Sequence, residues 1–427
     1  MVMIQGCTYL RGHVVMLSVN AFLFFMLLLL VAALLAPLIE KLKIPFSIFL
    51  ILLGYGSSEI ATKNFGIDIG INWENFRPLI IHFILPILIF QAAIMTDIRA
   101  LKENILPVFM LALPLLLVSA GIIAIGVYYS IDHPAGFPWI AALLAGAILS
   151  ATDPSAVLAL LGKYGAPKRL ILLLESEGLF NDATSIVLFG ILLTVALTGS
   201  EQGNNWMTAG MQFLTIFCGG IAAGAITGVV AHFIIRIHDS EYIHILVTII
   251  SAYISFILAQ DFLNLSGVMA VLSTGLTVRI LNRQIEARQS QKFVDDYWRF
   301  TASVAETLIF LLAGVTITLS MFTNQWLATL IGIAACIVAR TLIIFGSFPL
   351  FNLVSVANPI SMKQQLVLTW GGVRGTITLA LALSLPLSLD YWYTIQSIAY
   401  GVVLFTLFVQ TTTMIPLIKK LNLKNGQ

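Results

Sequence analysis

Residues 170–198, LILLLESEGLFNDATSIVLFGILLTVALT, form a long apolar segment that contains acidic residues. It is long and apolar enough to cross a lipid bilayer as one helix, which takes about 20 residues. Yet it carries Glu175, Glu177 and Asp182 within its apolar run. A charge at the bilayer centre costs about 2.5–3.5 kcal/mol, so each acid needs a partner, water or a function.

The rest of the chain has the same apolar character. Of its 427 residues, 59% are hydrophobic and only 10% are charged, and the mean hydropathy is +0.99. A soluble domain carries about one-quarter charged residues, so this composition excludes a soluble globular protein. The net charge of +2 and the lack of a basic run argue against nucleic-acid binding.

Signatures of bound cofactors are missing from the sequence. Cys7, Cys218 and Cys336 form no Cys-x-x-Cys pair, and there is no His-Glu-x-x-His motif, so we expect neither a resident metal nor another cofactor. There is no Walker-type loop, so we expect no use of ATP. We therefore expect a secondary transporter rather than an enzyme.

Apolar runs separated by short polar breaks predict an all-α membrane protein with thirteen transmembrane helices. The first run is too long for the core of a signal peptide, so we expect it to be retained. The expected spans are 14–38, 45–61, 78–96, 105–130, 137–162, 170–198, 206–235, 243–260, 264–282, 300–322, 325–354, 364–388 and 393–418.

The basic residues segregate when the chain is divided in this way. Three of the 22, Arg11, Lys63 and Arg77, fall on one side, and Arg340 and Arg374 lie within spans. Because positive loops stay in the cytoplasm, we expect the N-terminus outside and the C-terminus inside a bacterial inner membrane. The other 17 share the cytoplasmic side: Lys41, Lys43, Arg99, Lys102, Lys163, Lys168, Arg169, Arg236, Arg279, Arg283, Arg288, Lys292, Arg299, Lys363, Lys419, Lys420 and Lys424.

Thirteen spans divide as six, one and six. We expect one transmembrane domain over residues 1–427, with a first six-helix repeat at 14–198, a linker helix at 206–235 and a second repeat at 243–418. The single linker helix inverts the second repeat relative to the first. Transporters built in this way bind substrate near the membrane midplane, on broken helices.

Two helix breaks occupy equivalent places in the two repeats. Thr152-Asp153-Pro154 interrupts the fifth span, and the glycine-rich segment 371–375 interrupts the twelfth. Proline removes a backbone donor, and glycine weakens a helix by about 1 kcal/mol relative to alanine. We therefore expect both spans to be broken, crossing helices.

Two of the intramembrane acids are predicted to lie near the midplane. At about 1.5 Å per residue, Asp153 is about 15 Å from Lys163 and Asp182 about 19 Å from Arg169, in a core about 30 Å thick. The short loop between spans five and six lets both carboxylates face one cavity. For Asp153 a structural reading is equally open, because an acid beside a helix break can accept from freed backbone donors.

The remaining buried charges suggest structural partnerships. Arg340 is the only charged residue in its span and needs an anion, for which we choose Glu177. Glu306 and Arg374 could pair with each other, with Asp153, or with backbone groups freed at the breaks.

Taken in order, LESEGLFND at 174–182, ATDP at 151–154 and GGVRG at 371–375 resemble the cation/proton antiporter-1 family, whose bacterial members are the NhaP-type sodium/proton antiporters. The resemblance covers essentially all thirteen spans. It implies an NhaA-like fold, a homodimer, and a role in pH homeostasis through exchange of sodium or lithium for protons.

The resemblance also implies roles for individual residues. Asp182 matches the carboxylate that binds the proton and the monovalent metal cation, with Asn181 as its neighbour. Thr152 and Asp153 match the unwound segment of the fifth span, which contributes to the ion site. The Asn-Asp pair, in place of two aspartates, implies electroneutral exchange of one cation for one proton.

Other matches imply supporting roles. Glu177 matches a glutamate that pairs with an arginine of the eleventh span, here Arg340. Glu306 is similar to a glutamate of the tenth span, and Arg374 matches the arginine of the twelfth-span crossing.

Two positions depart from the family pattern. Many relatives have serine where this chain has Gly178, and many have glutamate where Phe90-Gln91-Ala92 has Gln91. Both positions can contribute ion ligands in relatives. Their loss makes Asp182 the main negative ligand and leaves the choice among sodium, potassium and lithium open.

We expect a proton and a partly dehydrated cation to compete for Asp182, so that only the neutralised site moves between inward- and outward-facing states. The partners are then the two ions and the lipid bilayer. A potassium/proton antiporter of the same fold is the main alternative. A sodium-coupled carrier of an organic anion, or a channel or structural membrane protein, fits the sequence less well.

Overall fold

All regular secondary structure is helical within the part that the computed structural model describes, residues 19–42, 45–65, 73–131, 136–198, 206–238, 240–282, 288–354 and 360–421. In an apolar membrane core every backbone donor and acceptor must be satisfied within the chain, and helices achieve this locally. The start of the first expected span and Arg11, Lys43, Arg283 and Lys424 lie outside these residues.

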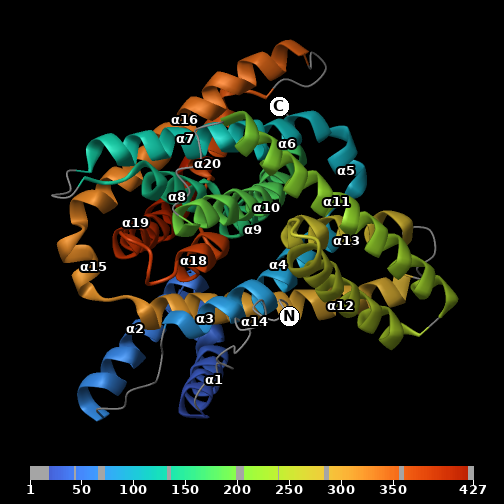
Figure 1. Cartoon of the computed structure of the whole chain (residues 1–427), viewed down its shortest axis with the longest axis horizontal. Coiled ribbons are helices and arrows are strands. Elements are labelled where there is room, and N and C mark those ends of the chain that lie inside the picture. The colour runs from blue at the N-terminus through green and yellow to red at the C-terminus, as the bar shows by residue number, and fades with distance from the viewer. Residues whose placement is uncertain are drawn as a thin grey trace, which may run out of the picture.

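The helices follow one another with short connections (Figure 1). Three turns are π-helical, η1 (Ile80–Ile84), η2 (Leu258–Phe262) and η3 (Thr406–Gln410). The α-helices are α1 (Val19–Leu42), α2 (Phe46–Phe65), α3 (Trp73–Leu79), α4 (Leu85–Met95), α5 (Ile98–Glu103), α6 (Ile105–Ala112), α7 (Pro114–Ser130), α8 (Trp139–Ser150), α9 (Ser155–Lys163), α10 (Lys168–Thr198), α11 (Trp206–Ile237), α12 (Glu241–Ile257), α13 (Gly267–Asn282), α14 (Arg288–Thr316), α15 (Leu319–Asn324), α16 (Trp326–Val354), α17 (Met362–Trp370), α18 (Thr376–Leu383), α19 (Trp392–Phe405) and α20 (Thr411–Leu421).

Ten helical segments of the described chain are long and apolar enough to cross a membrane. They overlap ten of the thirteen expected spans. Of the other three, the second and ninth correspond to shorter apolar helices at 46–61 and 267–282, and the twelfth is divided between α17 and α18. The chain is thus an all-helical, multi-pass membrane protein.

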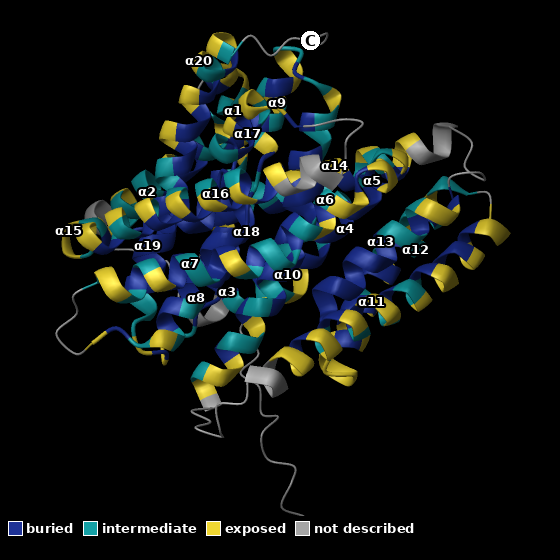
Figure 2. Ribbon diagram, turned by 90° about the horizontal axis from the view of Figure 1, so that it is seen from above, coloured by how far each residue is buried: buried dark blue, intermediate teal, exposed yellow. Residues whose placement is uncertain are grey.

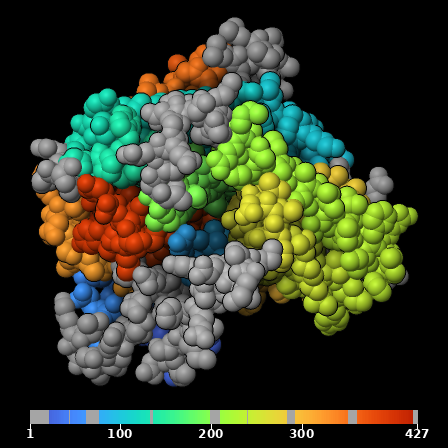
Figure 3. Space-filling view, in the orientation of Figure 1, coloured from blue at the N-terminus to red at the C-terminus, as the bar shows by residue number. Residues whose placement is uncertain are grey.

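Two groups of helices are visible in Figure 1. The larger contains α7, α8, α10, α16, α18 and α19, and the smaller contains α11, α12 and α13, which form the lobe at the right of the space-filling view (Figure 3). Helix α4 packs against α13, and α14 contacts α2, α4, α12 and α18, so both join the two groups.

Apolar side chains cover the outside of both groups as well as filling their interiors. Figure 2 shows buried residues inside the bundle and exposed residues along the outer faces of α11 and α12. Large side chains such as Leu34, Ile226 and Phe233 are more than half exposed. An apolar surface of this extent suits contact with lipid and would be a liability in water.

The smaller group is held together by very close packing of two helices. A Cβ atom at Gly224 of α11 would overlap the backbone of Ala270 on α13. Thr274 of α13 donates from Oγ1 to the Gly224 carbonyl oxygen at 3.0 Å. Small residues that let helix backbones touch are a common means of association in membranes.

Both expected helix breaks are present in the larger group. Helix α8 ends at Ser150 and α9 begins at Ser155, while α17 ends at Trp370 and α18 begins at Thr376. Pro154 disfavours helical backbone in the residue before it, and the glycines of 371–375 lower the cost of leaving the helix. The two extended segments place polar backbone groups in the middle of an apolar bundle.

Candidate ion-binding site

The two helix breaks meet directly. The backbone N–H of Asp153 donates to the carbonyl oxygen of Val373 at 2.7 Å, which joins the extended segments of the fifth and twelfth expected spans. Each break frees donors and acceptors that a continuous helix would pair. Their contact satisfies one such pair and leaves the remaining groups for nearby side chains.

The carboxylate of Asp153 accepts from both helices that begin at the crossing. The Ser155 N–H donates to Oδ1 at 3.1 Å, and the N–H and Oγ1 of Thr376 each donate to Oδ2 at 3.2 Å. Asp153 therefore lies at the positive ends of α9 and α18, where a negative charge is stabilised by about 0.3–1 kcal/mol per helix. These contacts fit a structural role for Asp153 at the helix break. Its carboxylate also borders a cavity.

Arg374 binds free carbonyl oxygens at the C-terminal ends of helices. Its Nε donates to the carbonyl oxygen of Leu149 at 3.0 Å, and its Nη1 donates to that of Gly372. These carbonyls belong to the end of α8 and to the second break, where a cation is favoured. Of the partners left open by the sequence, Arg374 thus takes backbone carbonyls.

Glu177 and Arg340 form a buried, bidentate ion pair. Arg340 Nη2 donates to Glu177 Oε2 at 2.9 Å, and Nη1 donates to Oε1. Nη2 and Nε also donate to the Leu368 carbonyl oxygen, at 3.0 and 3.2 Å. The pair ties α10 to α16 and α17, and it leaves the charge of Glu177 neutralised within the protein.

Asn181 connects this ion pair to the first break. Its Nδ2 donates to Thr152 Oγ1 and to Glu177 Oε1, each at 3.2 Å. Its Oδ1 is buried and has no hydrogen-bond partner among the described residues. The side chains of Thr152, Asn181 and Glu177 are thereby fixed relative to one another beside Asp182.

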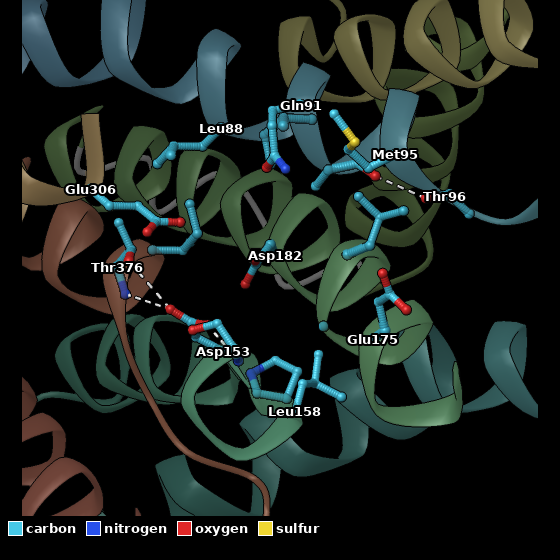
Figure 4. A pocket seen from close by; sticks show the side chains of 17 residues that line it. Leu88, Gln91, Met95, Thr96, Asp153, Leu158, Glu175, Asp182, Glu306 and Thr376 are labelled. Atoms are coloured by element: carbon cyan, nitrogen blue, oxygen red, sulfur yellow. Dashed lines mark hydrogen bonds between the residues drawn. The ribbon is translucent and has the colours of Figure 1, made fainter. Parts of the chain in front are cut away.

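Asp182 faces a cavity of about 200 Å³ (Figure 4). Its Oδ1 is buried without a hydrogen-bond partner in the described part of the chain. Four acids, Asp153, Glu175, Asp182 and Glu306, border the cavity, and the described lining residues include no Lys, Arg or His. The cavity therefore concentrates negative charge, which attracts cations and repels anions.

The two positions that depart from the family pattern also border the cavity. Gln91 of α4 contributes a neutral amide to the cavity lining. Gly178 of α10 allows the first break to approach, since a Cβ atom there would lie 2.7 Å from Pro154 Cδ and 3.1 Å from the Thr152 carbonyl oxygen. Glycine at 178 thus has a steric reason in this chain.

Two lining residues had no predicted role. Thr376 is the first residue of α18 and anchors Asp153, a pairing that neither sequence segment reveals alone. Glu175 lies two helical turns before Asp182, and a spacing of seven residues on one helix could have placed both on the same face.

Comparisons with known proteins agree with this architecture. The chain is 34% identical over 383 residues to the Na⁺/H⁺ antiporter ApNhaP of Aphanothece halophytica, covering 89% of this chain and 70% of the relative. It is 34% identical over 390 residues to the low-affinity Na⁺/H⁺ antiporter NhaS1 of Synechocystis sp., covering 90% and 71%.

The fold is also similar to a solved structure. The sodium proton antiporter MjNhaP1 from Methanocaldococcus jannaschii at pH 8 matches with a TM-score of 0.77 and 24% identity, covering 94% of this chain and 98% of the other. In addition, residues 27–420 match the family model described as sodium/hydrogen exchanger, transmembrane. The chain therefore belongs to the sodium/hydrogen exchanger family.

Proposed function

We propose that this chain is a secondary antiporter that exchanges sodium for protons across a membrane, with both ions competing for Asp182. The observation that carries the proposal is the state of this side chain, whose Oδ1 is buried, unpartnered among described residues, and set in an acidic cavity. The named functions of the relatives, Na⁺/H⁺ antiporters, point to the same exchange.

The neighbouring charges explain why Asp182 is the group that changes its charge. Glu177 is paired with Arg340, and Asp153 accepts three hydrogen bonds at two helix starts. A proton or cation on either would have to replace contacts already made. Among the described residues, Oδ1 of Asp182 has no hydrogen-bond partner that an incoming ion would have to displace.

Burial provides the coupling. A bare carboxylate in an apolar surrounding is costly, and a bound proton or cation removes that cost. We propose that the loaded site moves between the two membrane faces and the empty, charged site does not. One carboxylate then carries one proton in one direction and one cation in the other, so the exchange is electroneutral.

The cavity also bears on the alternatives. A carrier of an organic anion needs basic residues facing its substrate, whereas the described cavity lining is acidic. A potassium/proton antiporter would fit the same arrangement of charges. The sodium assignment follows the named functions of the relatives, and Gln91 and Gly178, which border the cavity, are the positions at which we expect ion preference to be tuned.

We further propose the complete topology that the sequence suggested. The thirteen crossings would combine the ten long helices with α2, α13 and the α17–α18 pair, grouped as repeats at 14–198 and 243–418 around a linker at 206–235. The meeting of the two breaks supports this symmetry. The N-terminus would lie outside and the C-terminus in the cytoplasm of a bacterial inner membrane, in a homodimer that needs neither cofactor nor ATP.

Flux through reconstituted vesicles tests the function. With the voltage clamped, a sodium gradient across vesicles with wild-type protein should drive protons in the opposite direction, which is measured as a pH change in the lumen. A potassium gradient should drive a smaller pH change. Asp182→Asn should abolish exchange while remaining folded, whereas Asp390→Asn, at an exposed position, should transport normally. Sodium-driven proton flux through Asp182→Asn would contradict the assignment.

A further inference from the structure

The last helices of the described chain lie along both halves of the twelfth expected span. Helix α19 packs against α18, and α20 packs against α17. The two are joined by the π-helical turn η3. At the end of α17, the indole N–H of Trp370 donates to Thr413 Oγ1 of α20 at 2.9 Å. The second helix break is therefore supported on its α17 side by α20, and its α18 side contacts α19.

Thr406, the first residue of η3, bonds both backbone groups of Arg374 within this break. The Arg374 N–H donates to Thr406 Oγ1 at 3.1 Å. The same Oγ1 lies 3.2 Å from the carbonyl oxygen of Arg374 and 3.0 Å from that of Val403. A hydroxyl has one proton and two lone pairs, so it can accept from the N–H while it donates to one of the carbonyls. One side chain thus supplies pairing that the interrupted helix no longer provides.

The π-helical turn fixes the position of Thr406. Its carbonyl oxygen accepts from the Thr411 N–H, five residues later, and from Thr411 Oγ1 at 3.3 Å. Both threonines are buried. Single π-helical turns of this kind occur frequently at functional sites. Because the site is buried, loss of the Thr406 hydroxyl would leave the backbone groups of Arg374 without this partner, which is costly in an apolar surrounding.

The bond from Arg374 to Thr406 bears directly on the contact between the two breaks. The Val373 carbonyl and the Arg374 N–H belong to one peptide unit, which is planar and rigid. Thr406 holds the N–H of this unit, and the carbonyl accepts from the Asp153 N–H at 2.7 Å. Asp153 in turn borders the cavity that Asp182 faces (Figure 4). A rotation of this peptide would therefore move Asp153 relative to the ion site.

We propose that Thr406 is a positioning residue for ion exchange, whose hydroxyl sets the orientation of the Val373–Arg374 peptide and thereby the place of Asp153 at the cavity. The inference rests on the proposed exchange function. The negative charge of Asp153 attracts a cation or a proton bound at Asp182 across the cavity. If Asp153 moves away, both ions bind more weakly.

Removal of the hydroxyl tests this role in reconstituted vesicles. Thr406→Val keeps the branched shape of the side chain and should raise the KM for sodium about two- to tenfold, the factor that loss of one hydrogen bond implies. Because the proton also binds more weakly, inhibition of exchange by acid should begin at a lower pH. A variant that is merely less stable would lose maximal rate, with the KM and the pH profile unchanged.

Two further variants separate positioning from stability. Thr406→Ser keeps the hydroxyl and should restore the wild-type KM and pH profile. Thr316→Val is the matched control, because Thr316 is also buried and its Oγ1 bonds to the Tyr400 hydroxyl at 2.9 Å, away from the break. It should lose stability without a shift in KM. A wild-type KM and pH profile in Thr406→Val, or equal shifts in Thr316→Val, would overturn the proposal.

Hydrogen exchange of the purified protein, followed by mass spectrometry, gives a readout that does not depend on transport. Thr406→Val should speed backbone exchange severalfold in peptides that cover residues 371–376 and 151–155, and Thr406→Ser should not. If Thr406→Val does not fold, Thr406→Ala takes its place. Unchanged hydrogen exchange in both segments would overturn the proposal. A wild-type protein that exchanges no sodium would instead contradict the proposed function.

Discussion

The buried ion pair between Glu177 and Arg340 gives the sharpest prediction about stability. Both residues are almost inaccessible, with 1% and 6% of their surface exposed. Arg340 makes two contacts to Glu177 and two to the Leu368 carbonyl oxygen. Replacing Arg340 with methionine removes all four contacts while keeping an elongated apolar side chain, and it strands a buried carboxylate.

The expected cost of Arg340→Met is about 3–5 kcal/mol of unfolding free energy, because removing one member of a buried pair leaves an uncompensated charge. Adding Glu177→Gln removes that charge and keeps an amide oxygen to accept from Asn181. The double variant should therefore recover most of the loss, since replacing a whole buried pair by neutral groups is often close to neutral.

Denaturant titration of the purified protein in detergent measures both effects. Arg279→Met is the matched control, because Arg279 faces Asp295 at 3.8 Å with about a quarter of its side chain exposed, and such pairs contribute about 0–1 kcal/mol. The reasoning fails if Arg340→Met costs no more than the control, or if the losses from Arg340→Met and Glu177→Gln simply add.

Three further outcomes are expected. Gly178→Ala should lower the free energy of unfolding by about 1–3 kcal/mol and slow exchange, because the added Cβ atom clashes with Pro154. Gly162→Ala places its Cβ atom in open space and should do neither. Equal melting and equal transport in the two variants would contradict the steric argument. Asp153→Ala should lower the free energy of unfolding by about 0.5–2 kcal/mol, as loss of a helix cap does, and Asp153→Asn should lower it by less. The same denaturant titration measures both changes. Finally, acidifying the face on which sodium is added should raise its KM in proportion to proton concentration without lowering the maximal rate; a pure loss of maximal rate would exclude competition.

The sequence predicted the all-helical, multi-pass character of the chain and the pairing of Glu177 with Arg340, for identifiable physical reasons. Charges are so costly in a membrane that Asp182, Glu177 and Arg340 stand out, and an unpaired arginine in an apolar span demands an acid. Helix breaks at 151–154 and 371–375 follow from local backbone chemistry. These features depend on single residues or short segments, which sequence displays directly.

Contacts across the bundle that involve backbone groups or close steric approach were not predictable. The partners of Arg374 were left open, because backbone carbonyls at a distant helix end carry no sequence signature. The bond from Thr376 to Asp153 and the steric need for Gly178 arise only when the two breaks pack against α10. Span counting is also inexact, since the apolar stretches at 46–61 and 267–282 are shorter than the ten segments that register as crossings by length.

Competition of sodium and the proton for Asp182 can be measured by counting the protons released when sodium binds. Purified protein in weakly buffered solution, at a pH where its site is protonated, is titrated with sodium while the pH of the medium is recorded. We predict one proton released per sodium bound by the wild type, none by Asp182→Asn, and one by Asp390→Asn. Sodium binding without proton release in the wild type, or undiminished release from Asp182→Asn, would show that the two ions do not share this carboxylate.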